Sequence, residues 1–456
     1  MNTIRIGNGA GFWGDRLDAP RRLAERGGLD YLTLEYLAEL TLSILAHQRS
    51  RDPQAGYVAD FVSAAESLLG VLKSQESLKI VTNAGGMNPL GCARAVAELL
   101  AENDLEDVVV AAVAGDDLLD HLDAHAEREE FRELKTGASF ADVEDRIASA
   151  NVYLGAEGIA AALEAGARIV IAGRVADASL TVGPAAWEFG WQWDDWDRLA
   201  TASVAGHLIE CGAQSTGGMF SDWTDEIALT NVGYPIAIIG EDGSVVITKP
   251  DGSEGVVNVA SVAEQLVYEI GDPRHYLTPD VDVDFSQVEL MLSGEDQVRV
   301  TGARGKPRPQ RYKVSMAYRD GYAAAGTLVV CGRDAEAKAR RCGQMIVARA
   351  ERAGCRFRRT HIECLGAGDS TAGIWPNSGE VSEVVLRVAV HADGREDADR
   401  FLREFAPLVT SGPPGVTGYT GPRSKSYPVM AYWPTTIDRS HVAATLEVHS
   451  ARDWLP

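Results

Sequence analysis

The chain has 456 residues, 45% of them hydrophobic and 24% charged, and its 43 Lys and Arg against 66 Asp and Glu give a formal net charge of −23. The apolar fraction excludes a disordered chain, and the negative charge disfavours a dedicated nucleic-acid binder. No apolar run reaches the roughly 18–20 residues that a membrane span needs. We therefore expect a globular protein that binds neither nucleic acid nor a membrane, with length for roughly two to three domains.

The first two hundred residues alternate short apolar runs with stretches of helical periodicity. A glycine-rich loop, Gly7–Gly14, is followed by a predicted helix over Leu17–Arg26. Apolar residues between Val58 and Leu72 keep helical spacing, and Glu157–Ala165 is the clearest further helix. Such alternation predicts a mostly parallel sheet with helices on both faces. Its strands are expected at Thr3–Ile6, Tyr31–Leu34, Ile80–Thr82, Val108–Val113 and Ile169–Ala172.

From Ile227 the pattern changes. A hairpin is expected around Glu241-Asp242-Gly243, and a helix over Val259–Ile270. The final third predicts two strand–helix–strand units, which favour a smaller α+β layer domain. We therefore divide the chain into an α/β domain over residues 1–284, with the hairpin inserted, and an α+β domain over 285–456. The elements of this final third are expected at Lys313–Tyr318, Gly326–Cys331, Ala335–Ala353, Thr360–Leu365, Val384–Ala389 and Glu396–Phe405.

Polar residues follow the predicted strands of the first domain. In open α/β sheets, ligands bind beyond the carboxyl ends of the strands, so this set predicts a site. Helix capping and loop solvation are the alternative explanation for its individual members. The set comprises Asn8, Asp15, Arg16, Glu35, Asn83, Asn88, Asp116, Asp117, Arg174 and Asp177.

The first glycine loop approaches a dinucleotide fingerprint. Gly9, Gly11 and Gly14 fit the G-x-G-x-x-G spacing, and Glu35 follows at about twenty residues, where an acid would meet a ribose hydroxyl. Asp15 places negative charge where a pyrophosphate would lie. Close packing of strand and helix is an equal explanation, so dinucleotide binding is the weaker hypothesis.

Three further segments contain candidate ligand-binding or catalytic residues. The turn at residues 81–89 offers Gly85 and Gly86 beside two asparagines, which suits a polar ligand, although an ordinary turn would look the same. Arg174 precedes Asp177 by three residues, as in an ion pair or an anion site. In residues 206–218, a helix would place His207 and Glu210 on one face, followed by a candidate nucleophile and a polar amide. Those last two residues are Cys211 and Gln214, and a buried, inert role for Cys211 is the alternative.

The six cysteines are scattered without a CxxC pair, and the N-terminus shows no export signal, so we expect reduced thiols and a cytoplasmic protein. No metal site is predicted, because His121 and His125 lie in a stretch crowded with charges that is typical of a solvated face. A basic cluster near the start of the final domain would suit a phosphate-bearing ligand or a neighbouring subunit, and simple solvation is the favoured explanation for most of its members. The cluster includes Arg299, Arg304, Lys306, Arg308, Arg311, Lys313 and Arg319.

Long strings of this sequence resemble the acyclic terpene utilisation (AtuA) protein family. The family occurs beside acyl-CoA carboxylases and hydratases of branched-chain or terpenoid acid breakdown, so the resemblance implies coenzyme A thioester chemistry. Some relatives carry an additional small domain with an HARSGDKGD-like signature that is absent here, so the resemblance implies either a separately encoded partner domain or a chain that acts without it. The matching strings are IRIGNGAGFWGDR, TLEYLAELT, VTNAGGMNP, SANVYLGAEGI, IAGRVADASLTVGPA, GHLIECGAQSTGG and SKSYPV.

These observations predict an enzyme that acts on a carboxylate or acyl-CoA substrate by acid–base chemistry, as a hydratase, dehydratase or related lyase. The alternatives are a non-catalytic subunit of an acyl-CoA carboxylase-type assembly and, more weakly, a dinucleotide-dependent enzyme. A homo-oligomer is expected, and no cofactor beyond the coenzyme A of a thioester substrate. The candidate catalytic residues are Asp15, Glu35, Asp177, His207, Glu210 and Cys211, and the candidate substrate-binding residues are Asn8, Gly11, Arg16, Asn83, Gly85, Gly86, Asn88, Arg174 and Gln214.

Overall fold

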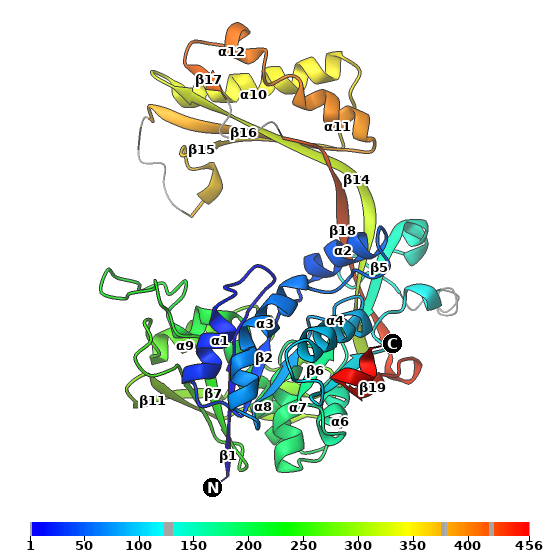
Figure 1. Cartoon of the computed structure of the whole chain (residues 1–456). Helices are drawn as coiled ribbons and strands as arrows, with labels where there is room; N and C mark the ends of the chain where they lie inside the picture. Colours follow the sequence, from blue (N-terminus) through cyan, green and yellow to red (C-terminus); the bar gives the residue numbers. More distant parts are fainter. Residues whose placement is uncertain (1, 123–130, 375–378, 380, 419–423, 456) are drawn as a thin grey trace. The chain divides into compact units, whose positions relative to one another are not determined.

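The structure is a computed structural model that describes residues 2–122, 131–374, 379, 381–418 and 424–455. The chain forms two compact units, the first made of Met1–Ala317 with Tyr432–Pro456 and the second of Tyr318–Ala431. Figure 1 labels the elements and colours the chain from its N-terminus to its C-terminus. The chain therefore enters the second unit after Ala317 and returns to the first at Tyr432.

A mixed sheet forms the centre of the first unit. Among the described residues, its central strands are parallel in the order β1-β2-β3-β6-β4. Antiparallel strands extend both edges, with β7, β8, β12 and β11 beyond β1 and with β19 beyond β4. The strands span Thr3–Asn8 (β1), Tyr31–Leu34 (β2), Lys79–Thr82 (β3), Ile169–Ala172 (β6), Val109–Ala114 (β4), Ile236–Gly240 (β7), Val245–Thr248 (β8), Gln297–Thr301 (β12), Glu289–Gly294 (β11) and Thr445–Ser450 (β19).

Local signals in the sequence begin and end the helices of this unit. Asn88 caps α4 by accepting the Gly91 N–H at 2.9 Å, and Pro89 occupies the first helical position. Asn258 caps α9 in the same way, and α7 ends at Gly190 in a left-handed conformation. The helices span Ala19–Arg26 (α1), Glu39–Arg49 (α2), Ala59–Ser74 (α3), Pro89–Ala101 (α4), Glu157–Glu164 (α6), Ser179–Phe189 (α7), Trp196–Glu210 (α8) and Val259–Val267 (α9).

Apolar side chains of α1, α3 and α4 pack with those of the central strands into one hydrophobic core. Every residue of β2 and β6 is buried, as expected for strands covered on both sides. A smaller antiparallel sheet is made of β9 (Tyr276–Leu277), β10 (Asp282–Asp284) and β13 (Arg304–Lys306). These elements surround the polar loops that follow the parallel strands.

The second unit has an antiparallel sheet and a core of its own. Strand β14 pairs with β16, and β15 pairs with β16 on its other side. Helix α10 buries a face of small and apolar residues, among them Ala339, Cys342 and Ile346, in the core of this unit. The elements span Arg311–Cys331 (β14), Ala335–Arg352 (α10), Arg359–Leu365 (β15), Glu383–Ala392 (β16), Arg395–Leu402 (α11), Leu408–Ser411 (α12), Val416–Gly418 (β17) and Tyr427–Asp438 (β18).

The structure confirms the α/β class, but the large sheet is mixed and has antiparallel strands on both edges. The compact units also differ from the predicted division at residue 285, because β11 and β12 join the first sheet and the C-terminal β19 returns to it. The two strands expected over residues 313–318 and 326–331 are one continuous strand, β14. Its middle, Gly321–Gly326, lacks the β-branched residues that mark a strand, yet it pairs with β16 from Tyr322 onward.

None of the helices in the described ranges has the length and apolar character that a membrane crossing requires. His121 ends a short 3-10 turn, Leu119–His121, and His125 lies outside the described residues.

Candidate active site

A cavity of about 930 Å³ opens in the first unit. The segments that follow β1, β2 and β6 reach it together, because the carboxyl ends of parallel neighbours lie at one edge of a sheet. The end of α8, the segment around β9 and the start of β14 complete the lining. Of the residues predicted from the sequence, those that line the cavity are Gly11, Asp15, Glu35, Arg174, Asp177, Glu210, Cys211 and Gln214.

Arg174 is a buried cation in the wall of this cavity, with 2% of its surface exposed. Its Nη2 lies 2.8 Å from Asp177 Oδ1, and its Nη1 lies 3.9 Å from Glu35 Oε1 and donates to the Leu37 carbonyl. The guanidinium carbon lies 4.0 Å from the centroid of the Tyr153 ring. Burial acts to lower the pKa of Arg174, but the combined charges around it, that of Asp177 first among them, outweigh burial and the pKa is raised. Arg174 therefore stays charged while its Nε has no hydrogen-bond partner among the described residues.

A second layer of polar side chains fixes the Arg174 backbone. Asp116 accepts the Arg174 N–H at 2.9 Å and an N–H of the Asn151 amide at 2.8 Å. Burial raises the pKa of Asp116 to about 6. Gly173 has no room for a side chain, since a Cβ there would lie 2.3 Å from Asp116 Oδ1. The loop after β6 is thereby held in one conformation.

Glu35 is oriented by Asn83. The Asn83 amide donates to Glu35 Oε2 at 2.5 Å, and the Leu37 N–H donates to Oε1 at 2.7 Å. Burial, and then the charge of Asp177, hold the pKa of Glu35 well above its usual range. Asn83 is itself buried and does not line the cavity. It therefore positions a candidate proton-transfer group, whereas the sequence suggested a substrate contact.

Asp177 opens onto the cavity, with 35% of its side chain exposed. Desolvation raises its pKa, the charge of Arg174 opposes that shift, and the charge of Glu39 adds to it. Glu35, Asp177 and Glu210, hereafter the carboxyl cluster, all line the cavity and all have raised pKa values, largely because of burial. Carboxyl groups with raised pKa values are candidates for proton transfer.

His207 and Glu210 lie on one face of α8, as their spacing predicts. His207 Nδ1 is 3.2 Å from Glu210 Oε1, and Gln265 Nε2 donates to the His207 carbonyl at 2.9 Å. Burial raises the pKa of Glu210 to about 7, while the hydrogen bond from His207 partly opposes it. Burial acts to lower the pKa of His207, but its bond to Glu210 leaves the pKa raised. His207 is buried and does not line the cavity, so it holds Glu210 in place.

Cys211 follows α8 and lines the cavity. Burial, followed by the charge of Glu210, raises the pKa of its thiol to about 12. The reactive form of cysteine is the thiolate, which this setting disfavours at neutral pH. The surroundings therefore favour a proton-transfer site over a cysteine nucleophile.

The glycine loop is closed by its own carboxylate. Asp15 accepts the Gly11 N–H at 2.8 Å, the Arg16 N–H at 2.7 Å and the Tyr234 hydroxyl. Gly11 lies against the end of α8, where a Cβ would come within 2.5 Å of the Gly212 nitrogen. The Gly11 N–H that a pyrophosphate would need is thus already bonded, which favours close packing as the explanation of this loop.

Asn8 and Arg16 lie outside the cavity lining. The Asn8 amide donates to the carbonyls of Ala10, Ile209 and Glu210, each at 2.9 Å, and so ties the end of β1 to the end of α8. The Arg16 guanidinium bonds Asp18 at 3.0 Å and lines a separate pocket. Both residues support the loops of the site from behind.

The turn after β3 is structural. Asn88 caps α4, and the Gly85 N–H donates to the Ala172 carbonyl at 3.1 Å. Gly86 has a φ of 49°, and a Cβ there would lie 2.4 Å from a methyl group of Leu45. None of these three residues lines the cavity, so their predicted ligand contacts are absent from this surface.

Sequence reasoning missed Glu39 as a member of the site. Its Oε1 accepts the Tyr153 hydroxyl at 2.5 Å and Lys313 Nζ at 3.0 Å. Burial acts to raise the pKa of Glu39, but the charge of Lys313 and the hydrogen bonds from Tyr153 and Lys313 together lower it to about 2. Lys313 is 274 residues away in the chain, so the sequence holds no local signal for this pair. Arg311 and Lys313, two members of the predicted basic cluster, both line the cavity.

Part of the cavity lining is apolar and open to solvent. Five large side chains combine these two properties, in contrast to the buried groups around Arg174. These exposed lining residues, hereafter the apolar rim, are Phe12, Leu134, Met219, Tyr268 and Leu277. The cavity therefore combines a buried ionisable part with an exposed apolar part.

A family model described as "Acyclic terpene utilisation family protein AtuA" matches residues 4–448 of the chain. The match covers both compact units and every segment that lines the cavity. Comparison with the curated proteins and with the solved structures gave no match.

Proposed function

This chain belongs to the acyclic terpene utilisation (AtuA) family, and we propose that it is an enzyme of carboxylic acid or acyl-CoA metabolism that works by acid–base chemistry. The reaction we propose is the hydration or dehydration of a branched or terpenoid-type acyl substrate. The observation that carries the proposal is the carboxyl cluster, whose three members have raised pKa values and share one cavity with the buried Arg174.

Dehydration of a 3-hydroxyacyl group requires two proton transfers. A base removes a proton from C2, an acid protonates the hydroxyl that leaves C3, and the products are a 2-enoyl group and water. A carboxyl group with a pKa near the working pH serves either step. Glu210, whose pKa burial raises to about 7, fits this requirement best, and Asp177 is the second such group open to the cavity.

Removal of the C2 proton places negative charge on the carbonyl oxygen of the substrate. Arg174 is a fixed cation in the cavity wall, although its Nε atom, which has no partner among the described residues, is itself buried. A preorganised positive charge of this kind stabilises a developing oxyanion without reorganising during the reaction. We assign Arg174 this role, with Glu35 and Asp116 holding it in position.

The apolar rim supports an acyl chain of some size. Phe12, Met219 and Leu277 line the cavity and leave large apolar surfaces exposed, and contact with a branched hydrocarbon chain would bury them. Arg311 and Lys313 also line this part of the cavity, although Lys313 is paired with Glu39 at 3.0 Å, so Arg311 is the cation that could meet an acidic group of the substrate. An amphipathic substrate with an apolar tail and an acidic or thioester head meets both requirements.

Turnover of defined thioesters tests the proposal. A 3-methyl-branched 2-enoyl-CoA is incubated with the full chain, and loss of the conjugated thioester absorbance reports hydration. We expect Glu210→Gln and Asp177→Asn each to lower kcat by about 100-fold or more. Glu66→Gln, an exposed site on α3, is the matched control and keeps the full rate. Equal rates in all four proteins would reject the assignment.

We further propose a cytoplasmic homo-oligomer that acts with a separately encoded small family domain. All six cysteines are free thiols, which suits a reducing compartment. If turnover appears only after the small domain is added, and the two proteins sediment together, the partnership is supported. A chain that binds carboxylase subunits but turns over no thioester would instead be the non-catalytic subunit.

A further inference from the structure

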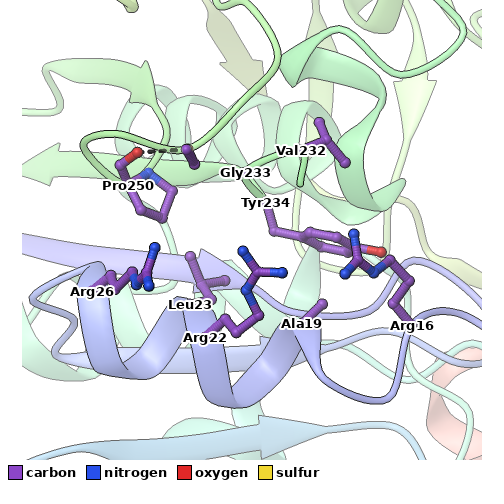
Figure 2. A pocket seen from close by; sticks show the side chains of 10 residues that line it. Arg16, Ala19, Arg22, Leu23, Arg26, Val232, Gly233, Tyr234 and Pro250 are labelled. Atoms are coloured by element: carbon purple, nitrogen blue, oxygen red, sulfur yellow. Dashed lines mark hydrogen bonds between the residues drawn. The ribbon is translucent and has the colours of Figure 1, made fainter. Parts of the chain in front are cut away.

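A second pocket, separate from the large cavity, lies between α1 and the segments that flank the hairpin β7–β8. Its lining contains three guanidinium groups, those of Arg16, Arg22 and Arg26, and no carboxylate. Figure 2 shows Arg22 and Arg26 extending from α1 toward the segments of Gly233 and Pro250, with Arg16 beside the Tyr234 ring. The pocket has a volume of about 20 Å³, which limits its occupant to one small group.

The charges of this pocket are not balanced by the protein. Asp18 is the carboxylate that pairs with its arginines, at 3.0 Å from Arg16 and 3.4 Å from Arg22. Arg26 has neither an ion pair nor a side-chain hydrogen bond within the described ranges. Asp18 thus pairs with two of the three cations and the charge of Asp15 also acts on Arg16, so that Arg26 is the cation of this pocket without a carboxylate partner among the described residues.

Two of these cations repel each other along α1, and a bound anion would relieve that repulsion. Arg22 and Arg26 are four residues apart on α1, so they occupy one face of the helix, where like charges destabilise it. The neighbouring Arg21 shows the alternative, because it points elsewhere and pairs with Glu25 at 2.9 Å. A tetrahedral anion offers several acceptor oxygens to forked donors of this type.

We propose that Arg16, Arg22 and Arg26 form a binding site for a phosphoryl group. The pocket also adjoins the candidate active site, since Tyr234 lines both the pocket and the large cavity and donates its hydroxyl to Asp15. The phosphoryl group belongs either to the carrier of a thioester substrate or to a separate phosphorylated molecule. Only the first of these sources rests on the proposed function.

Binding of inorganic phosphate and of coenzyme A to the full chain, measured by calorimetry, tests the site without any turnover. We expect phosphate to bind the wild type, and Arg22→Gln/Arg26→Gln to weaken that binding at least tenfold. The double variant Arg22→Lys/Arg26→Lys retains the positive charges, so its phosphate affinity should fall less than that of the double glutamine variant. Arg21→Gln is the matched control on the same helix and binds as the wild type does. Phosphate binding that is absent from the wild type, or unchanged in the double glutamine variant, overturns the proposal.

Competition then identifies the source of the phosphoryl group. If the carrier supplies it, coenzyme A displaces phosphate, and the double glutamine variant raises KM for a coenzyme A thioester but not for the phosphate-free pantetheine thioester. If coenzyme A leaves phosphate in place, the site serves a separate phosphorylated ligand. If the wild type binds phosphate but turns over none of the thioesters, the proposed function is rejected and the phosphoryl-binding site still stands.

Discussion

At the scale of single residues, the site depends on one buried cation among carboxyl groups. Arg174 compensates the charges of Glu35 and Asp177, which lie 3.9 Å and 2.8 Å from its guanidinium nitrogens. Such groups are costly to bury, and they remain compatible with folding only while their partners are present. Buried ionisable groups with raised pKa values are the basis of the acid–base role that we propose for this site.

Removing the cation therefore destabilises the first unit. We expect Arg174→Leu to lower the free energy of unfolding by about 3–5 kcal/mol, because Glu35 is left buried without its partner. In the double variant Arg174→Leu/Glu35→Gln, part of the lost free energy of unfolding is restored, so the effects of the two single substitutions on stability are not additive. Urea unfolding of both single variants and the double variant measures the coupling. Strictly additive losses would contradict the pairing.

The pH dependence of stability follows from Glu210. Burial raises its pKa from the usual 4.5 to about 7, so the folded state holds this proton more tightly than the unfolded state does. The resulting stabilisation is complete below the unfolded pKa of 4.5 and is lost as the pH rises through about 7. The raised pKa of His207 acts in the same direction.

We therefore expect the wild type to lose stability between pH 5.5 and pH 8.5, and Glu210→Gln to reduce that loss by an amount on the order of 2 kcal/mol. Chemical unfolding at both pH values checks this, with Glu66→Gln as the control that follows the wild type. A pH dependence that is the same in Glu210→Gln and in the wild type would show that Glu210 titrates normally.

Several site residues were predictable because they follow strands or share a helical face. Glu35 and Arg174 come directly after predicted strands, and the spacing of His207 and Glu210 indicated their contact. The sequence could not distinguish a group that faces the cavity from one that supports it. Asn8 and Asn83 proved to be supporting residues, since the direction of a side chain depends on contacts across the fold.

At the scale of elements, predictions succeeded where the periodicity is local. Strands β2 and β6 have the predicted limits, and α6 and α10 differ from theirs by one residue. Strands β11, β12 and β19 were missed; β11 and β12 form a local hairpin, whereas the other partner of β12 and the partner of β19 are distant in the chain. Strand β19 pairs with β4, more than 300 residues earlier in the chain. Pairing of this kind depends on a partner that the strand's own sequence does not reveal.

The segment after β19 anchors this edge of the sheet. Trp454 is buried, belongs to the core of the first unit and donates its indole N–H to the Val110 carbonyl at 3.0 Å. We expect Trp454→Ala to lower the free energy of unfolding by about 3–5 kcal/mol. Thermal or urea unfolding measures the loss, and Tyr427→Ala, an exposed aromatic on β18, should change stability by less than about 0.5 kcal/mol. Equal effects would mean that the segment is not packed on β4.

At the scale of the whole molecule, two units with separate hydrophobic cores share one chain. The net charge of −23 is an average over a surface that includes local clusters of arginine. An anionic ligand can bind despite the negative net charge, because it would contact local basic residues. These are Arg22 and Arg26 in the small pocket, or Arg311 and Lys313 in the large cavity.

Separate cores predict separable unfolding. Phe401 is buried in the second core, with its ring centroid 5.2 Å from that of Phe405. We expect Phe401→Ala to lower the free energy of unfolding of the second unit by about 3–5 kcal/mol. The unfolding transition of the first unit, which Trp454→Ala shifts, should stay at the same temperature in Phe401→Ala. Calorimetry of the full chain resolves the two transitions. A single transition that both variants shift equally would contradict the independence of the cores.

The central claim is that the carboxyl cluster transfers protons to and from an acyl substrate. The most direct test is the exchange of the C2 proton of a branched 3-hydroxyacyl thioester for deuterium in D₂O, followed by NMR. The account predicts exchange catalysed by the wild type and by Glu66→Gln, and at least a 100-fold loss in Asp177→Asn and Glu210→Gln. A thioester that binds the wild type without exchange, or exchange that persists in both variants, would contradict it.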